Sequence, residues 1–172
     1  MEDKLIKITD KQRNIGGGYV LRFLYILRTA QHTKVTIIKL LCKMVLRYYR
    51  LRFGLEISPE VKIGRGLYLG HAFNITVNSN VVIGDWCNLH KGVVIGQENR
   101  GKRKGTPILG NRVWVGINAA IVGNIKIGDD VLIAPNSFVN CDIPSHSVVY
   151  GNPCIIKHRF NATEGYINNV FE

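Results

Sequence analysis

Two histidines lie inside the repetitive part of the sequence, and each has a side chain suited to catalysis. His71 comes two residues after Leu69, at a position expected to point outward from a repeating coil. His90 occupies a repeat position that holds glycine in most other repeats. Because imidazole titrates near neutral pH, either ring could act as a general base towards a hydroxyl group. An ordinary surface histidine is the alternative for each. The remaining histidines lie in no motif: His32, His146 and His158.

These histidines belong to a six-residue repeat in which a bulky aliphatic residue returns from Ile57 towards Pro144. The next residue is usually glycine, and another apolar residue comes four positions after each aliphatic. An α-helix has a period of 3.6 and a strand a period of two, so neither produces this pattern. Short strands and turns wound into stacked coils do, which predicts a parallel β-helix of four to five coils. The repeat is unbroken in its last third: Leu109, Val115, Ile121, Ile127, Ile133 and Val139.

Three segments resemble the hexapeptide-repeat acyltransferases, and most closely the serine acetyltransferases and the related O-acetyltransferases of polysaccharide synthesis. They are IGRGLYLGHA at 63–72, GVVIG at 92–96 and VYGNP at 149–153. The resemblance implies a mainly β fold, a left-handed parallel β-helix of triangular section. It divides the chain into a basic N-terminal helical extension (1–55), the β-helix acetyltransferase domain (56–157) and a C-terminal tail (158–172).

The resemblance also implies roles for two residues. His71 matches the histidine that serves as general base in these acetyltransferases, taking the proton of the acceptor hydroxyl as it attacks the thioester of acetyl-CoA. Glu56 stands fifteen residues earlier, where serine acetyltransferases carry an aspartate that orients the base. Strict eighteen-residue stacking would instead place residue 53 beside His71, so the contact rests on the resemblance. A solvated Glu56 is the alternative.

Two departures from serine acetyltransferases concern the acceptor. Those enzymes carry an aspartate before the catalytic histidine and a histidine before a proline in the protruding loop, and this chain has Gly70 and Thr106 there. Because those groups engage the charged ends of an amino acid, their loss favours a neutral hydroxyl. We therefore expect a sugar or polysaccharide precursor as acceptor, with L-serine as the alternative and a non-catalytic scaffold as an alternative of another class. His90 is expected to help shape the acceptor pocket.

The donor implied by the resemblance is acetyl-CoA, used as a co-substrate in direct transfer, and no metal is expected. It would lie in a groove between subunits of a homotrimer, reached by the basic loop 97–107 of a neighbouring chain. A solvated, flexible loop is the alternative. Gly96 is the candidate for holding the oxyanion. The candidate residues for donor binding are Gly96, Gly116, Ile117, Pro135 and Lys157.

The first 55 residues hold twelve basic and three acidic side chains, a net charge of +9 out of +11. Residues 1–18 are polar and end in three glycines, which indicates a mobile lead-in. Helical periodicity from residue 19 to 52 predicts two helices, broken near 29–33 and ended by Gly54. We expect them to cap the solenoid, with peripheral membrane contact through residues 19–53 as the alternative. No nucleic-acid-binding signature is present.

Cysteine usage and hydropathy indicate the cellular compartment in which the protein is expected. The four cysteines form no CxxC pair, and Cys87 falls on an apolar repeat position, where it is expected to be buried. No signal peptide is recognised, and no apolar run is long enough to span a bilayer. These features predict reduced thiols and a cytoplasmic location, with the inner face of the membrane as a variant of it.

Overall fold

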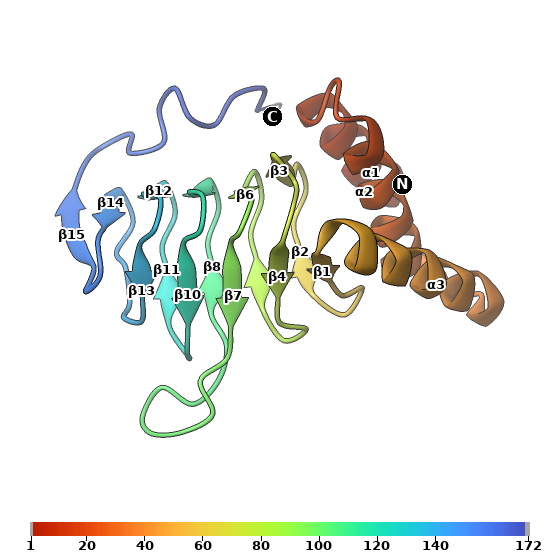
Figure 1. The fold of residues 1–172 in the computed structure, drawn as a ribbon. Helices are drawn as coiled ribbons and strands as arrows, with labels where there is room; N and C mark the ends of the chain where they lie inside the picture. The colour runs from red at the N-terminus through yellow and green to blue at the C-terminus, as the bar shows by residue number, and fades with distance from the viewer. Residues whose placement is uncertain (1, 171–172) are drawn as a thin grey trace.

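The computed structural model describes residues 2–170, in which three helices stand at one end of a β-solenoid (Figure 1). The helices are α1 (Glu2–Arg13), α2 (Gly18–His32) and α3 (Thr36–Phe53). The chain then winds through about five turns, and its C-terminal segment returns along the solenoid towards α1. The mainly β fold with a helical N-terminal region is therefore confirmed.

Three sheets form the sides of the solenoid, and all their strands are parallel except β15, which pairs antiparallel with β14. The first sheet holds β1 (Leu55–Ile57), β4 (Ile75–Val77), β7 (Val94–Gly96), β10 (Ala120–Val122) and β13 (Phe138–Val139). The second holds β2 (Lys62–Ile63), β5 (Val82–Ile83), β8 (Ile108–Leu109) and β11 (Lys126–Ile127). The third holds β3 (Tyr68–Gly70), β6 (Asn88–His90), β9 (Val113–Val115), β12 (Val131–Ile133), β14 (Ser147–Tyr150) and β15 (Ile155–His158).

The repeating aliphatic residues fill the interior, as the sequence predicts. Val115 pairs with Ile133 eighteen residues later, and both are completely buried. Leu69 pairs with Leu89 twenty residues later. The first turn is two residues longer than eighteen because the six-residue repeat shifts by two residues between Ile75 and Val77. Burying each such side chain contributes about 1.5–3 kcal/mol, so the stacked rows supply the main stabilisation of the solenoid.

The first turn of the solenoid has an open edge, and side chains of α1 bind its backbone. The Asp10 carboxylate accepts a hydrogen bond of 2.9 Å from the Leu67 amide. The Asn14 amide group accepts one of 3.1 Å from the Leu69 N–H and donates one of 2.8 Å to the Leu67 carbonyl. Backbone groups that have no neighbouring strand are thereby satisfied.

Two buried arginines and a glutamine complete this cap. Arg28 of α2 donates to the carbonyls of Ile63 (2.8 Å) and Gly64 (2.6 Å), and its Nε lies 2.8 Å from the Asp10 carboxylate. Arg13 donates to the Gly66 carbonyl. Gln31 donates a 2.8 Å hydrogen bond to the carbonyl of Val61. The capping role predicted for the helices of residues 19–52 is therefore confirmed for α2, and α1, for which no helix was predicted, shares it.

The expectation of a mobile lead-in at residues 1–18 is wrong. Residues 2–13 form α1, whose solenoid-facing side is largely polar and is buried: Thr9, Asp10 and Arg13, followed by Asn14. A search for apolar periodicity cannot detect such a helix, because its buried face binds backbone rather than apolar side chains.

α3 ends where the sequence predicts, and few of its residues are buried. Gly54 follows it with φ of +65°, a left-handed conformation that favours glycine. The break before it falls at residues 33–35, slightly later than expected. Only Leu46 and Tyr49 of α3 are buried, and the helix extends away from the solenoid in Figure 1.

The C-terminal segment is anchored at both ends of its path. Asp130 accepts hydrogen bonds from the backbone amides of Ala162 (2.9 Å) and Thr163 (3.0 Å). Further along, the Asn168 carbonyl accepts from Arg13 of α1 at 3.3 Å. The tail thus ties the last turns of the solenoid to the cap.

Breaking the buried Asp10–Arg28 ion pair is expected to destabilise the fold. Asp10→Ala leaves Arg28 buried without its carboxylate and should lower the free energy of unfolding by about 3–5 kcal/mol. The matched control is Glu98→Ala, which removes an exposed ion pair with Arg103 and should cost no more than about 1 kcal/mol. Urea denaturation measures both, and equal losses would contradict the capping role.

Candidate functional site

His71 lies at the corner where the third sheet turns into the first. It follows β3 directly, its φ is +50° and its side chain is exposed. Successive turns stack beneath this corner, since the Lys91 amide donates to the Gly70 carbonyl (3.0 Å) and the Asn118 amide to the Lys91 carbonyl (3.0 Å). A column of backbone therefore runs along the solenoid from His71.

A cavity of about 360 Å³ opens at His71. One wall consists of His71, Tyr68 and Ala72, and the other is the turn 14–20 between α1 and α2, including its three glycines. The Tyr19 hydroxyl donates a 2.7 Å hydrogen bond to the Ala72 carbonyl and so fixes the turn against the corner. Within residues 2–170 the His71 ring makes no hydrogen bond, which leaves its nitrogens available to a ligand.

His90 lies one turn below, paired with Gly70 in the third sheet. Its Nδ1 is 2.9 Å from the Val115 carbonyl, so Nδ1 carries the proton and donates, and Nε2 is the acceptor. Its ring also packs against Trp114, with centroids 4.6 Å apart. Burial lowers the pKa of His90, and the nearby His71 lowers it further, against the opposing hydrogen bond to Val115. The hydrogen bond and the packing hold the His90 ring in one orientation, and its lowered pKa favours the neutral form.

The packing of His90 explains why residue 70 is glycine. A Cβ on Gly70 would lie 2.3 Å from Cδ2 and 2.6 Å from Nε2 of His90. These distances are too short for any side chain unless the imidazole moves, and its hydrogen bond and its packing hold it in place. The absence of an aspartate at position 70 is thus coupled to the presence of His90.

Glu56 lies on β1, where it pairs with Thr76 of β4. Its Oε1 is 3.4 Å from Nη1 of Arg50, and about half of each side chain is exposed. Among residues 2–170, no hydrogen bond joins Glu56 to His71. The expected orienting contact stays a prediction, and Arg50 is the partner that the single chain provides.

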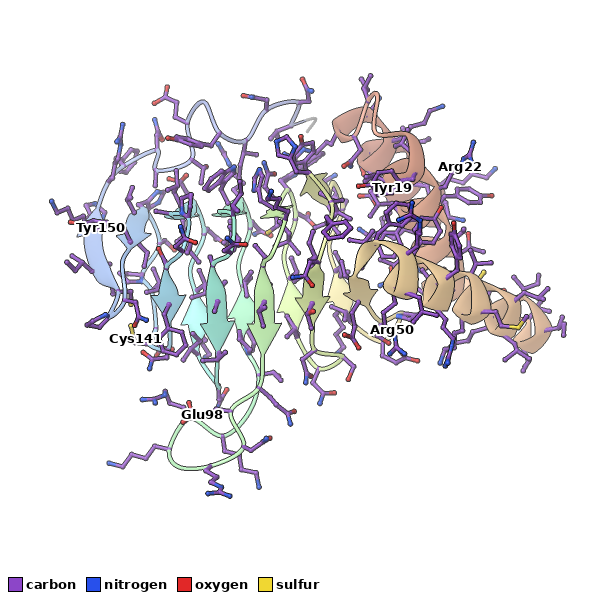
Figure 2. The ribbon with its side chains drawn as sticks, in the orientation of Figure 1. Tyr19, Arg22, Arg50, Glu98, Cys141 and Tyr150 are labelled. Atoms are coloured by element: carbon purple, nitrogen blue, oxygen red, sulfur yellow. The ribbon has the colours of Figure 1, made fainter. Side chains whose placement is uncertain are left out.

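The structure does not bring Thr106 and Gly96 to His71 within one chain. Gly96 ends β7, and Thr106 precedes β8, so both lie at the corner between the first and second sheets. The Thr106 hydroxyl donates to the Asn80 carbonyl at 3.2 Å. Figure 2 shows Glu98 in the extruded loop and Tyr19 near the cap on opposite sides of the molecule.

The candidate donor-binding residues fall partly on the His71 corner. The Asn136 amide donates to the Ile117 carbonyl at 2.9 Å, which continues the column beneath His71. A Cβ on Gly116 would lie 2.6 Å from the Pro135 nitrogen, so the turns approach closely there. Lys157 lies on β15, exposed and 5.7 Å from the Tyr150 ring. Gly116, Ile117 and Pro135 thus lie together along the corner, and Lys157 lies beyond its end.

Sequence reasoning missed three contributors to this region. The turn 14–20 forms one wall of the cavity. Trp114 packs on His90 on one side and on Tyr166 on the other, with centroids 5.1 Å apart in the latter pair. No sequence signal links Tyr166 to the site, because the returning tail brings it there through tertiary packing.

Residues 2–170 contain neither a metal-binding cluster nor a membrane-spanning helix. No group of three or more His, Cys, Asp or Glu side chains is placed to hold a metal ion. No helix there has the length and apolarity needed to cross a membrane. Cys87 is completely buried as predicted, and burial raises its pKa to about 12, which makes its thiol a weak nucleophile.

Comparison with known proteins places this geometry in a family context. The model of the bacterial transferase hexapeptide, described as six repeats, matches residues 106–141. A serine acetyltransferase of Synechococcus elongatus is 36% identical over 110 residues, covering 64% of this chain and 45% of that protein. One from Helicobacter pylori is 41% identical over 99 residues, 58% of each chain. The chain spans about half the length of these curated relatives.

Solved structures agree in fold. Soybean serine acetyltransferase apoenzyme superposes with a TM-score of 0.77 at 23% identity, covering 91% of this chain and 69% of that one. Serine acetyltransferase of Neisseria gonorrhoeae in complex with serine gives a TM-score of 0.65 at 29% identity, covering 80% of this chain and 55% of the other. The likeness extends beyond the repeats into the helical region, since 91% of the chain is covered.

From the lowered pKa of His90 we predict that the free energy of unfolding decreases in acid. Burial lowers its folded-state pKa, so the unfolded chain binds a proton more readily, and stability falls as pH drops below the ordinary value of about 6.5. Between about pH 7.5 and 5, His90→Gln should lose less free energy of unfolding than the wild type. The exposed His158→Gln serves as control. Equal pH dependence in His90→Gln and wild type would remove His90 as the cause.

Proposed function

The chain belongs to the hexapeptide-repeat acyltransferases of the serine acetyltransferase family, and on that premise we propose that it moves an acetyl group from acetyl-CoA to a hydroxyl oxygen. One observation carries the proposal. The exposed His71, in the segment that matches the catalytic motif, opens into a 360 Å³ cavity and has no hydrogen bond to another residue of 2–170. Such a ring is free to bind a substrate proton.

His71 is the general base in this proposal. It accepts the hydroxyl proton as the acceptor oxygen attacks the thioester carbonyl, and a tetrahedral oxyanion forms. Collapse of this species breaks the carbon–sulfur bond, and His71 returns the proton to the thiolate. The products are an acetyl ester and free CoA, without an acyl-enzyme. Backbone amides stabilise the oxyanion, and Gly96 of a neighbouring subunit is the proposed donor.

The donor site is proposed along the column beneath His71. Gly116, Ile117 and Pro135 lie on that corner, where closely spaced turns present backbone groups to an extended ligand. Lys157 lies beyond its end with its ammonium exposed, in a position to meet the phosphates of CoA.

A homotrimer is part of the proposal, because the candidate residues are divided between two corners. His71, Gly70 and His90 lie at one corner, whereas Gly96 and Thr106 lie at another. Packing around a threefold axis would bring the loop 97–107 of one chain to the His71 corner of the next. The site would then be complete only between subunits.

L-Serine is the acceptor that the comparisons favour, since both curated relatives above are serine acetyltransferases. This supports the alternative from the sequence better than the sugar acceptor expected there. One observation still favours a neutral sugar hydroxyl as second candidate. Gly70 is packed against His90, so position 70 supplies no carboxylate beside His71 to bind the amino group of serine. The assay below decides between them.

Replacement of His71 is expected to abolish transfer. Thiol release from acetyl-CoA is followed with L-serine and with a panel of neutral sugars, and His71→Ala should lower the rate by more than about a hundredfold. Glu56→Gln should lower kcat and shift the pH profile if the carboxylate orients His71 in the assembly. His158→Ala is the matched control, because His158 is exposed on β15.

The outcomes of this assay separate the proposals. Release with serine alone supports the relatives' substrate, and release with sugars alone supports the second candidate. No release with any acceptor would favour a non-catalytic scaffold. An unchanged rate in His71→Ala with the fold intact would reject His71 as the base.

Membrane contact was the alternative to a cap for residues 19–53, and it stays a proposal, now for α3 alone. This helix carries five basic residues and no acidic one. Its outward face holds large apolar residues at alternating spacings of four and three, all at least half exposed: Ile37, Leu41, Met44, Tyr48 and Leu51. An apolar face flanked by basic side chains fits the interface of an anionic bilayer.

Flotation with vesicles of phosphatidylglycerol tests this contact. The wild type should float, and the double variant Leu41→Gln/Met44→Gln should bind several-fold less, since both side chains are exposed and little of the fold depends on them. Ile155→Gln, an exposed apolar residue on β15, is the control. If nothing floats and the double variant changes the sedimentation coefficient, the face is an interface between copies.

A further inference from the structure

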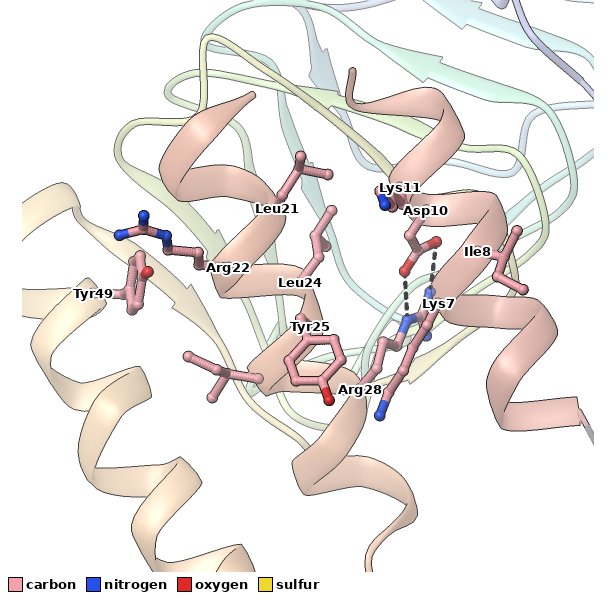
Figure 3. A pocket seen from close by; sticks show the side chains of 11 residues that line it. Lys7, Ile8, Asp10, Lys11, Leu21, Arg22, Leu24, Tyr25, Arg28 and Tyr49 are labelled. Atoms are coloured by element: carbon pink, nitrogen blue, oxygen red, sulfur yellow. Dashed lines mark hydrogen bonds and ion pairs between the residues drawn. The ribbon is translucent and has the colours of Figure 1, made fainter. Parts of the chain in front are cut away.

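A cleft of about 540 Å³ lies between the three helices, away from the His71 cavity (Figure 3). It is lined by residues of α1 and α2 and by Tyr49 of α3. Its lining shares no residue with that of the His71 cavity. Its volume lies within the range of pockets that hold small molecules, about 300–1,000 Å³.

The walls and floor of the cleft are mainly apolar. Leu24 and Tyr49 are buried at its base, and Leu21 and Tyr25 line it from α2. Ile8 lines it from α1 and is half exposed. Because exposed apolar surface costs free energy in water, this lining favours a ligand with an apolar body.

The charged side chains that line the cleft are mainly positive. Lys7, Lys11 and Arg22 line it, and none of the three forms an ion pair with another side chain described at residues 4–170. Lys7 donates to the Thr29 hydroxyl at 3.0 Å, whereas Lys11 and Arg22 are exposed. Figure 3 shows Lys11 on α1 and Arg22 on α2.

Among the described side chains, Asp10 is the only carboxylate that lines the cleft, and it is already satisfied. Asp10 accepts from Arg28 at 2.8 Å and from the Leu67 amide at 2.9 Å. Its negative charge is matched by Arg28, so it does not cancel the three cations. The excess positive charge favours a negative group in a ligand that fills the cleft and displaces water from these cations.

We propose that this cleft binds an anionic amphiphile, a molecule with a single alkyl chain and a phosphate or carboxylate head. The alkyl chain lies against Ile8, Leu21 and Tyr25, and the head pairs with Lys11 and Arg22. The buried polar face of α1 is explained by its hydrogen bonds to the first turn of the solenoid. The apolar side chains that line the cleft take no part in those hydrogen bonds. The site is independent of acetyl transfer.

Calorimetric titration of the full chain with dodecyl phosphate, below its micelle concentration, tests the site. One molecule should bind per chain, and dodecyl maltoside, which lacks the charge, should bind about tenfold more weakly or worse. Inorganic phosphate has the charge of the head group but no alkyl chain, so it should bind more weakly than dodecyl phosphate. Arg22→Gln and Ile8→Gln should each weaken dodecyl phosphate binding about fivefold to tenfold.

Matched controls keep the test specific. Lys102→Gln and Ile155→Gln remove an exposed cation and an exposed apolar residue elsewhere and should leave binding unchanged. Thermal unfolding provides a second readout, since a ligand that binds only the folded state raises Tm in proportion to its occupancy. Acetyl transfer in Arg22→Gln and Ile8→Gln should match the wild type, so failure here is distinguishable from failure of the proposed enzyme activity.

Vesicles of phosphatidylglycerol distinguish the source of the amphiphile. If bilayer lipid enters the cleft, Arg22→Gln and Ile8→Gln should reduce vesicle binding as they reduce dodecyl phosphate binding. If vesicle binding is unchanged in them, the ligand is a free amphiphile. Absence of saturable dodecyl phosphate binding, or equal binding by wild type and both variants, would overturn the proposal.

Discussion

The open edge of the first solenoid turn sets the main constraint on this structure. In a parallel solenoid, the backbone N–H and C=O groups of each strand form hydrogen bonds with strands of the neighbouring turns, but the first turn has no neighbour on one side. Here Asp10, Asn14 and Arg28 bind the amides and carbonyls of residues 63–69 directly. Because unpaired buried backbone groups are costly, these contacts allow the stack to begin at a defined place.

The same cap forms part of the candidate site. The turn that joins α1 to α2 lies across the cavity from His71, and the Tyr19 hydroxyl binds the Ala72 carbonyl next to it. The tail returns to the cap through Arg13 and contributes Tyr166 to the packing around His90. Stability at this end and the shape of the cavity therefore depend on the same helices.

Stacking also couples residues that are distant in sequence. Gly70 and His90 are twenty residues apart, yet the imidazole fills the space that a side chain at position 70 would need. The space beside position 70 thus depends on a residue one turn below it. Within one chain, by contrast, Thr106 lies at a different corner from His71, where its hydroxyl donates to the Asn80 carbonyl.

The six-residue repeat by itself determined the solenoid, its buried aliphatic rows and the position of His71 on an outward corner, and the helical periodicity before it determined the helix end at Gly54, because each depends on local spacing and turn conformation. Tertiary structure decided the rest. α1 escaped prediction since its buried face is polar, and its partners are backbone groups more than fifty residues away. The cavity, the neutral state of His90 and the basic cleft arise only when separate elements meet, so no pattern within one segment records them.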